Sequence, residues 1–146
     1  MPTYILKFSK FKINKNKRDL LARGITKIHS NVTGANSYFA QVIFQKNENN
    51  FHYMGGKPIN SKEIFLHGHI RGGRTSLIKK NLIKKLRDFI VKNLNLSKDS
   101  VWVYISELEP EQMIEYGEIL PPSGQEKRWF NQLPKKLKTK LLKLDF

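Results

Sequence analysis

Two arginines in the short sequence RGGR are the side chains best suited to binding an anion. The chain holds 27 basic residues, but only six are arginines, and Arg71 and Arg74 are two of these. A planar guanidinium can hold a carboxylate through two parallel hydrogen bonds, which a lysine cannot do. Gly72 and Gly73 would allow a tight turn that points both side chains one way. The loop therefore fits either a carboxylate site or a solvated basic turn.

Pro2 directly follows the initiator methionine. A methionine before a small residue such as proline is usually removed, which would leave the secondary amine of Pro2 as the N-terminus. An α-amino group titrates near pH ~7.7–8.0, so modest changes in its surroundings could make it an acid or a base. The structural alternative is that Pro2 only stiffens the start of a strand, where its missing N–H is not needed.

Three further side chains could transfer protons, although each also has a structural explanation. His29 lies beside the apolar stripe of an expected helix, near the helix C-terminus, where the dipole favours a histidine. Tyr104 lies in the strand-like sequence VWVYI and would normally be packed with one hydrogen bond. Glu115, in MIEYGE, is expected on a short helical turn at the surface. His67 and His69 could share a strand face, but the spacing suggests no third metal ligand.

Alternating strands and helices would position these residues. Strands are expected at Thr3–Ser9, Tyr38–Lys46, Glu63–Ile70 and Ser100–Glu107, and helices at Lys15–Val32 and Ser76–Leu94. Between the two units, the Gly-rich link 47–62 is expected to contain a hairpin. The order predicts an α+β fold made of a tandem β-α-β repeat, with parallel pairing inside each unit. Copies of the same protein could cover the edges of so small a sheet.

The segment 126–146 is basic and amphipathic. It contains seven lysines and arginines, and its leucines at 133, 137, 141 and 144 recur at helical spacing. This pattern predicts one helix that packs on the same domain and turns its lysines to water. The net charge of +15 also suits a nucleic-acid-binding module. Because no nucleic-acid-binding motif accompanies the lysines, a solvated surface is the favoured explanation.

Composition excludes several kinds of protein. The chain has no cysteine, so disulfides, thiolate metal sites and cysteine nucleophiles are excluded. No apolar run is long enough to span a membrane, and the first residues lack the pattern of a signal peptide. RGGR and GGKP lack the strand and helix context of a phosphate-binding P-loop. A cytoplasmic protein of one domain is the expectation.

Taken together, the motifs resemble the tautomerase superfamily and, within it, the cis-3-chloroacrylic acid dehalogenase family. The matching stretches are MP and Tyr4 at the start, GITKIHS, TG followed by FAQVIFQ, EIFLHGHIRGGR, SVWVYISE and MIEYGEILPPSG. The resemblance covers residues 2–125, with β-α-β units at about 2–47 and 63–108, and extends loosely into WFNQLP. It implies a tautomerase (MIF-like) fold with two helices on one face of the sheet, a homotrimer, and neither metal nor cofactor.

The resemblance also implies a catalytic set and a reaction. The family's site residues fall on Pro2, His29, Arg71, Arg74, Tyr104 and Glu115. They imply addition of water to a small α,β-unsaturated carboxylate, with or without a halogen at C3. The two arginines and His29 would bind the carboxylate, Glu115 oriented by Tyr104 would activate water, and Pro2 as an ammonium would protonate C2. The alternative is keto–enol tautomerisation of 2-oxo or 2-hydroxy acids by a neutral Pro2.

One part of the expected pocket departs from the family pattern. The family carries Thr-Gly-Thr where this chain has Thr33, Gly34 and Ala35. The neighbouring pocket residues Tyr38 and Phe39 are also bulkier than the family pattern leads one to expect. The resemblance therefore leaves the choice of substrate open.

Overall fold

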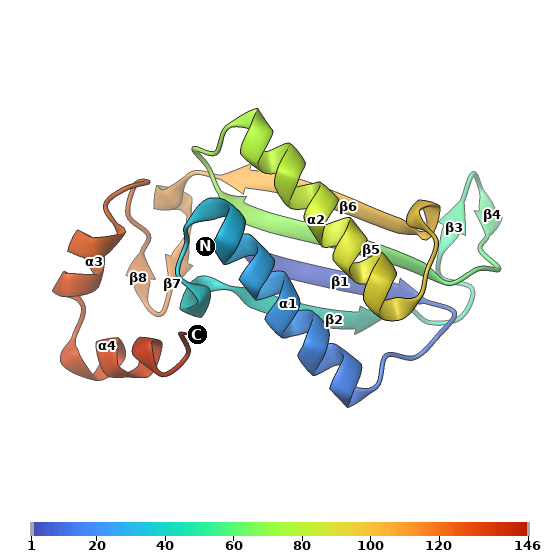
Figure 1. Cartoon of the computed structure of the whole chain (residues 1–146), viewed down its shortest axis with the longest axis horizontal. Helices are drawn as coiled ribbons and strands as arrows, with labels where there is room; N and C mark the ends of the chain where they lie inside the picture. Colours follow the sequence, from blue (N-terminus) through green and yellow to red (C-terminus); the bar gives the residue numbers. More distant parts are fainter. Residues whose placement is uncertain (1, 146) are drawn as a thin grey trace.

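A four-stranded mixed sheet forms the centre of the computed structural model, which describes residues 2–145 (Figure 1). Its strands are β1 (Thr3–Ser9), β2 (Gln41–Lys46), β5 (Glu63–Arg71) and β6 (Val101–Leu108), in the order β2-β1-β5-β6. β1 is parallel to β2 and β5 is parallel to β6, which confirms the pairing predicted within each unit. The two units meet where β1 runs antiparallel to β5.

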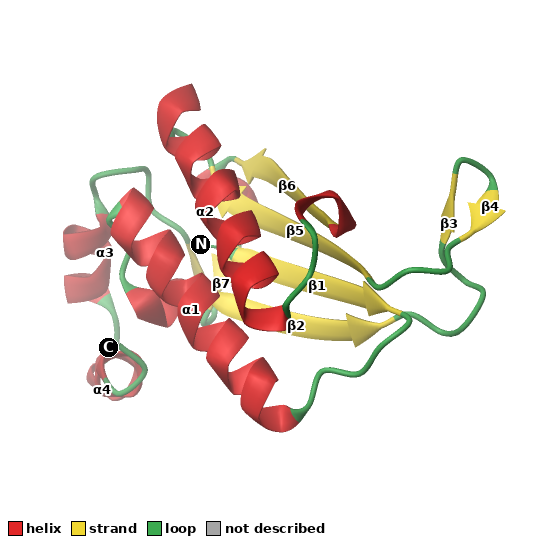
Figure 2. Ribbon diagram, turned by 45° about the vertical axis from the view of Figure 1, so that its right-hand side comes forward, coloured by secondary structure: helices red, strands yellow, loops and turns green. Residues whose placement is uncertain are grey.

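Two long helices, α1 (Lys15–Thr33) and α2 (Ser76–Leu94), lie on one face of this sheet (Figure 2). Each begins at a short polar residue whose side chain accepts a backbone N–H: Asn14 from Lys17 at 2.9 Å and Thr75 from Ile78 at 3.3 Å. Each helix is followed by a residue in the left-handed conformation, Gly34 or Asn95. These local stop and start residues explain why the predicted helix bounds agree closely with the observed ones.

The core lies between the helices and the inner face of the sheet. On β1 the alternate residues Tyr4, Leu6 and Phe8 are buried beneath the helices, and Pro2 is buried at the start of the same alternation. The core residues of α1, α2 and β5 that are 0% exposed are Leu21, Ile25, Leu66, Leu82, Leu86 and Ile90. Each such side chain contributes roughly 1.5–3 kcal/mol on burial, so this layer holds the N-terminal end of β1 in place.

The two helices approach each other closely at Gly24. A Cβ atom at this position would lie 1.9 Å from Cζ of Phe89 on α2. Although alanine is the better helix former by about 1 kcal/mol, we expect Gly24→Ala to lower the free energy of unfolding by about 1–3 kcal/mol through this clash. Urea denaturation would measure the change. In a Phe89→Ala background the same substitution should be neutral or stabilising, and an equal loss in both backgrounds would contradict the explanation.

The connections between the main elements contain 3₁₀ turns and a hairpin. A 3₁₀ turn, η1 (Ser37–Phe39), precedes β2, so the strand predicted from Tyr38 begins instead at Gln41. The expected hairpin in the link is present as β3 (Tyr53–Met54) and β4 (Lys57–Pro58), and it projects from one end of the molecule (Figure 1). A second 3₁₀ turn, η2 (Lys98–Ser100), leads into β6.

Glu115 does not lie on a helical turn, so that prediction was wrong. A 3₁₀ turn, η3 (Pro110–Gln112), is followed by a hairpin of β7 (Ile114–Glu115) and β8 (Glu118–Ile119). Tyr116 and Gly117 at its tip both have positive φ, 57° and 87°. Two successive residues with positive φ are what a two-residue hairpin turn requires, and they place Glu115 on a strand.

The C-terminal segment is two short helices rather than the single predicted helix. These are α3 (Glu126–Gln132) and α4 (Lys135–Leu142). Pro134 separates them, because the residue before a proline is driven into an extended conformation, as Leu133 is here (ψ 149°). Leu141 is fully buried, whereas Leu144, predicted on the packed face, is 49% exposed.

A second, smaller core joins these helices to the rest of the domain. Its buried members are Tyr38, Phe39, Met113, Leu120, Trp129, Leu133 and Leu141. The Asp145 carboxylate accepts hydrogen bonds from the Ser37 backbone N–H at 3.0 Å and from the Ser37 hydroxyl. The C-terminal segment is thereby fixed against η1. Within residues 2–145, no helix combines the length and apolar character needed to cross a membrane.

Candidate active site

Pro2, directly before β1, and His29, near the C-terminal end of α1, lie at the same end of the sheet. The carbonyl oxygen of Pro2 accepts a hydrogen bond from the Gln41 N–H at 2.9 Å, which anchors the start of β1 against β2. Two residues further, on the same strand face, the Tyr4 hydroxyl lies 2.8 Å from Nδ1 of His29. The two rings meet edge to face, with centroids 5.8 Å apart. The sequence prediction placed both Pro2 and His29 in a site, and the fold brings them to one region.

His29 is held as a neutral imidazole. Burial lowers its pKa to about 3, and the positive charge of Arg74 adds to the effect. Burial raises the pKa of Tyr4, so its phenol also stays uncharged. A neutral His29 can donate one hydrogen bond and accept one, but it carries no positive charge for substrate binding at neutral pH.

The buried neutral state of His29 should make the fold sensitive to mild acid. Its pKa is about 3 in the folded chain and ~6.5 when unfolded, so acid favours the unfolded state, which binds the proton. Its contribution is present above pH 6.5 and declines as the pH falls, by about 2 kcal/mol between pH 7 and pH 5. Urea denaturation at both pH values should show this loss, and His29→Gln should show a smaller one. Equal losses in the two proteins would contradict the assignment.

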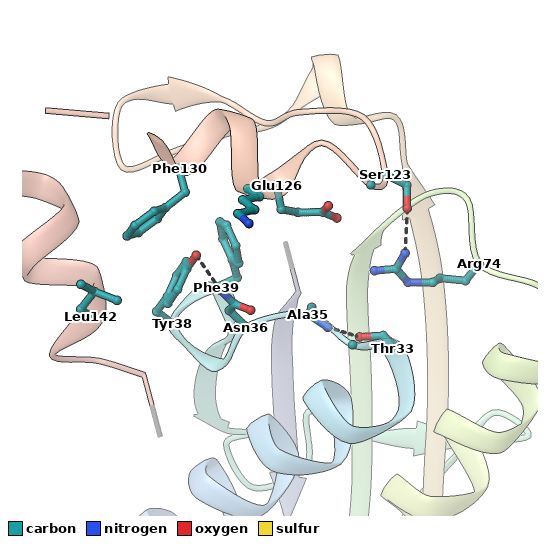
Figure 3. Close-up of a pocket in the computed structure, with 13 residues that line it drawn as sticks. Thr33, Ala35, Asn36, Tyr38, Phe39, Arg74, Ser123, Glu126, Phe130 and Leu142 are labelled. Carbon is teal, nitrogen blue, oxygen red and sulfur yellow. Dashed lines mark hydrogen bonds between the residues drawn. The ribbon is translucent and has the colours of Figure 1, made fainter. Parts of the chain in front are cut away.

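Arg74 lines a pocket of about 500 Å³ at this end of the molecule (Figure 3). It follows the loop at the end of β5, where Gly73 has a φ of 94° and so takes a conformation that suits glycine. The guanidinium Nη1 donates to the Ser123 hydroxyl at 3.2 Å, and the backbone N–H points to the Glu107 carboxylate at 3.4 Å. Burial and the nearby Arg71 lower the pKa of Arg74, but a guanidinium remains protonated at neutral pH.

Arg71 does not line this pocket. Its side chain is only 1% exposed; Nη1 donates to the Pro121 carbonyl at 2.9 Å and Nη2 forms an ion pair with Glu126. Burial is the largest single influence and would raise the pKa of Glu126, but the hydrogen bond and charge of Arg71 together with backbone hydrogen bonds outweigh it and hold that pKa below its usual value. Glu126 itself lines the pocket. The structure therefore does not bring the two guanidinium groups together as an exposed pair, and the predicted role of Arg71 in binding substrate stays a prediction.

Glu115 lines a second cavity, of about 490 Å³, together with Thr3, Gln112 and Tyr116. Phe39 lines both this cavity and the Arg74 pocket. Thr3, the residue next to Pro2, therefore lies at the cavity that contains a carboxylate, and this cavity shares Phe39 with the pocket that contains a guanidinium. Thr33, Tyr38 and Phe39, which the sequence analysis expects at the substrate pocket, line the pocket of Arg74.

Tyr104 lies elsewhere, on the face of the sheet that the helices leave open. It is 51% exposed and contacts Trp102, with ring centroids 6.4 Å apart, and Phe65, at 5.1 Å. Its position four residues before the end of β6 places it about 13 Å along the strand from Leu108. Tyr104 lines neither the pocket of Arg74 nor the cavity of Glu115. The structure of one chain thus does not bring it to Glu115.

The two strand histidines contact each other on the same open face. The rings of His67 and His69 have centroids 4.2 Å apart, and Nε2 of His67 lies 2.7 Å from the Ser106 hydroxyl. No cluster of three or more His, Cys, Asp or Glu residues within 2–145 is arranged to hold a metal ion.

Sequence reasoning missed the pocket residues that lie after the repeat. Ser123, Glu126, Phe130 and Leu142 all line the Arg74 pocket. Ser123 lies in PPSG, one of the motifs that carry the resemblance to the family. That motif is the only feature of the sequence that indicates Ser123 as a site residue. The other three belong to the basic amphipathic tail, whose pattern predicts packing rather than a site, so periodicity alone could not identify them.

Comparisons with known proteins agree with the observed fold. Residues 1–133 match a family model described as "Putative oxalocrotonate tautomerase enzyme". The crystal structure of N1, a member of the cis-3-chloroacrylic acid dehalogenase family, is 30% identical, with a TM-score of 0.92 over 97% of this chain and 99% of that one. The structure of native Ps01740 is 22% identical, with a TM-score of 0.72 over 77% of this chain and 99% of that one. No curated protein sequence matches the chain.

A third solved structure shows the fold in an oligomer. The Q0 fused 4-OT symmetric trimer is 14% identical, with a TM-score of 0.73 over 81% of this chain and 94% of that one. That likeness concerns the fold. The match over nearly the whole chain to a family model, together with the 30% identity to N1, identifies the chain as a member of the tautomerase superfamily and, within it, of the cis-3-chloroacrylic acid dehalogenase family.

Proposed function

We propose that this protein adds water to α,β-unsaturated carboxylates, with Pro2 as the general acid and Glu115 as the base. The observation that supports this most is that the cavity of Glu115, which Thr3 beside Pro2 lines, and the pocket of Arg74 are neighbours that share Phe39. A substrate held there would have a cation at its carboxylate end and a carboxylate beside the carbon to be attacked.

The proposed reaction balances with these groups alone. Arg74 binds the substrate carboxylate and stabilises the negative charge that moves onto it, as donors at an oxyanion do at ~3–4 kcal/mol each. Glu115 takes a proton from water while the water oxygen bonds to C3, and the Pro2 ammonium gives its proton to C2. The proton on Glu115 then returns to the amine through solvent. If C3 carries a halogen, the adduct loses halide and a proton to form malonate semialdehyde.

His29 and Arg71 would support the carboxylate end. If Nδ1 of the neutral His29 accepts a hydrogen bond from the Tyr4 hydroxyl, the ring carries its own proton on Nε2. That N–H could donate a hydrogen bond to the substrate carboxylate. Arg71 would act on substrate directly only if the Glu126 carboxylate left its guanidinium. Without that movement, Arg71 would position the wall that contains Glu126.

Tyr104 would need a neighbouring copy of the chain in order to orient Glu115. It is half exposed beside Trp102, on the sheet face without helices, and such a patch of aromatic side chains is typical of a surface that another subunit covers. A homotrimer, as in the fused 4-OT named above, would supply that copy. We therefore propose that Tyr104 acts across a subunit boundary.

Keto–enol tautomerisation remains the second candidate, because Pro2 is buried. Burial and a nearby guanidinium both lower the pKa of an amine, whereas Glu115 would raise it. A neutral Pro2 would act as a base instead of an acid. An NMR titration of the ¹⁵N-labelled terminal nitrogen decides between the two: an amine mostly charged at pH 7 fits hydration, and a mostly neutral amine fits tautomerisation.

A product assay tests the proposed reaction directly. Purified protein is incubated with cis-3-chloroacrylate, with propiolate and with the enol of phenylpyruvate, and products are followed by ¹H NMR. We expect chloride release and malonate semialdehyde from the first, and malonate semialdehyde from the second. Rapid ketonisation of the enol without hydration of either acid would contradict the proposal in favour of the tautomerase.

A further inference from the structure

The Arg74 pocket has two chemically different ends. At one end lie Arg74 and Ser123, and at the other lie the side chains of Tyr38, Phe130 and Leu142, with Phe39 and Glu126 between them (Figure 3). One end therefore suits a carboxylate and the other suits an apolar group. At about 500 Å³, the pocket falls within the range that encloses ligands of drug size, and a three-carbon acid would leave most of it to water.

The apolar end is built from aromatic rings that contact one another. Tyr38 lies 4.5 Å from Phe39 and 5.9 Å from Phe130 between ring centroids, and Phe39 lies 5.5 Å from Trp129. The Tyr38 hydroxyl is held by Asn36 at 2.8 Å. Because these rings pack against one another and the Tyr38 hydroxyl is hydrogen-bonded, this wall is preformed. Ligand binding would therefore cost little side-chain conformational entropy.

The C-terminal segment closes the pocket at the same end. The hydrogen bonds from Ser37 to Asp145 fix the chain just beyond α4 against η1, and Leu142 at the end of α4 lines the pocket. Leu142 is nevertheless 59% exposed. An exposed leucine on a pocket wall gains contact area when an apolar ligand lies against it.

The charge of the pocket fits an anion. Glu126 is neutralised by its ion pair with Arg71, which leaves Arg74 and Lys127 as the cations among the lining residues. These two cations favour an anionic ligand, and an uncharged ligand would leave the guanidinium of Arg74 without a charged partner.

We propose that the substrate is an unsaturated carboxylate that carries an aryl or similarly large apolar group at C3, the end away from the carboxylate. This inference rests on the proposed function for the reaction itself. It assigns the carboxylate to Arg74 and the apolar group to the wall formed by Tyr38, Phe130 and Leu142. The pocket would accordingly select against the three-carbon acids.

Binding of unreactive acids tests the ligand class without turnover. Calorimetry with 3-phenylpropionate and propionate should show at least about tenfold tighter binding of the aryl acid, since burial of a ring of this size is worth roughly 1.5–3 kcal/mol. Leu142→Ala should reduce this preference by about fivefold. Leu144→Ala is the matched control, because Leu144 is similarly exposed but lies outside the pocket, and it should leave the preference unchanged.

Turnover of phenylpropiolate and propiolate separates this inference from the proposed function. Hydration of phenylpropiolate gives benzoylacetate, and hydration of propiolate gives malonate semialdehyde. The kcat/KM for phenylpropiolate divided by the kcat/KM for propiolate should fall in Leu142→Ala. If neither acid turns over but 3-phenylpropionate still binds preferentially, the reaction is wrong and the ligand class stands. If propiolate turns over and the aryl acid binds no tighter than propionate, or if Leu142→Ala and Leu144→Ala act alike, the ligand class is overturned.

Discussion

A serine inserted between Met1 and Pro2 should abolish turnover while leaving the fold intact. Removal of methionine would then leave serine at the N-terminus and convert the Pro2 nitrogen into an amide, which can neither give nor take a proton near neutral pH. The loss should be at least about 10²–10⁴-fold in kcat, the usual contribution of one general acid. Substrate binding at Arg74 should change much less, because the carboxylate contact does not involve the amine.

The control for this insertion is Pro2→Ala, which keeps a free but primary amine. Mass spectrometry must first establish that methionine has been removed from each protein. The insertion variant should be inactive, and Pro2→Ala should be impaired while its pH profile follows the new amine. Circular dichroism should show the same helix content in all three proteins. Full activity of a correctly processed insertion variant would exclude every mechanism that uses the Pro2 nitrogen.

Arg74→Ala should lower kcat/KM by about 10²–10³-fold. This substitution removes the guanidinium of the pocket and leaves the substrate carboxylate without its charged partner when the negative charge on it increases. A single donor of this type is worth roughly 3–4 kcal/mol of transition-state stabilisation. Both kcat and KM should be affected, because the charge is present in the bound acid and grows during the reaction.

Arg74→Lys and Arg87→Ala are the matched controls. Lysine keeps the charge but lacks the planar donor pair, so an intermediate loss of about tenfold is expected. Arg87 lies on α2 and pairs with Asp88 at the surface, so its removal should leave kinetics unchanged. Thermal denaturation checks the fold, because Arg74 also donates to Ser123. If Arg74→Ala retains parental kcat/KM, the carboxylate binds elsewhere.

The main helices and strands could be predicted because each has a local pattern with clear ends. Helix α2 illustrates this: its apolar residues recur at helical spacing, Thr75 caps its start and Asn95 ends it. The same reasoning fails for segments too short to show a period. Glu115 lies on a strand of two residues, and its hairpin depends on the backbone at Tyr116 and Gly117 rather than on alternation.

The candidate site was predictable in residue type but not in contacts. Loop composition identified Arg71 and Arg74, yet it could not show that Arg71 pairs with Glu126, which lies 55 residues further along the chain. The apolar wall also depends on contacts between distant parts of the chain, because tertiary packing of the tail brings Phe130 and Leu142 to the pocket. Tyr104 could be assigned to a strand face, but which molecule covers that face depends on assembly.

The position of the chain ends has a practical consequence for handling this protein. Under the proposed mechanism, an affinity tag on the N-terminus would block the Pro2 amine. Because Asp145 holds η1 through Ser37, a tag on the C-terminus would disturb the pocket wall. The β3–β4 hairpin projects from the opposite end of the sheet (Figure 1), and Gly55 and Gly56 at its turn are exposed. A peptide label inserted between these two glycines should permit purification and surface immobilisation of an enzyme with both ends unmodified.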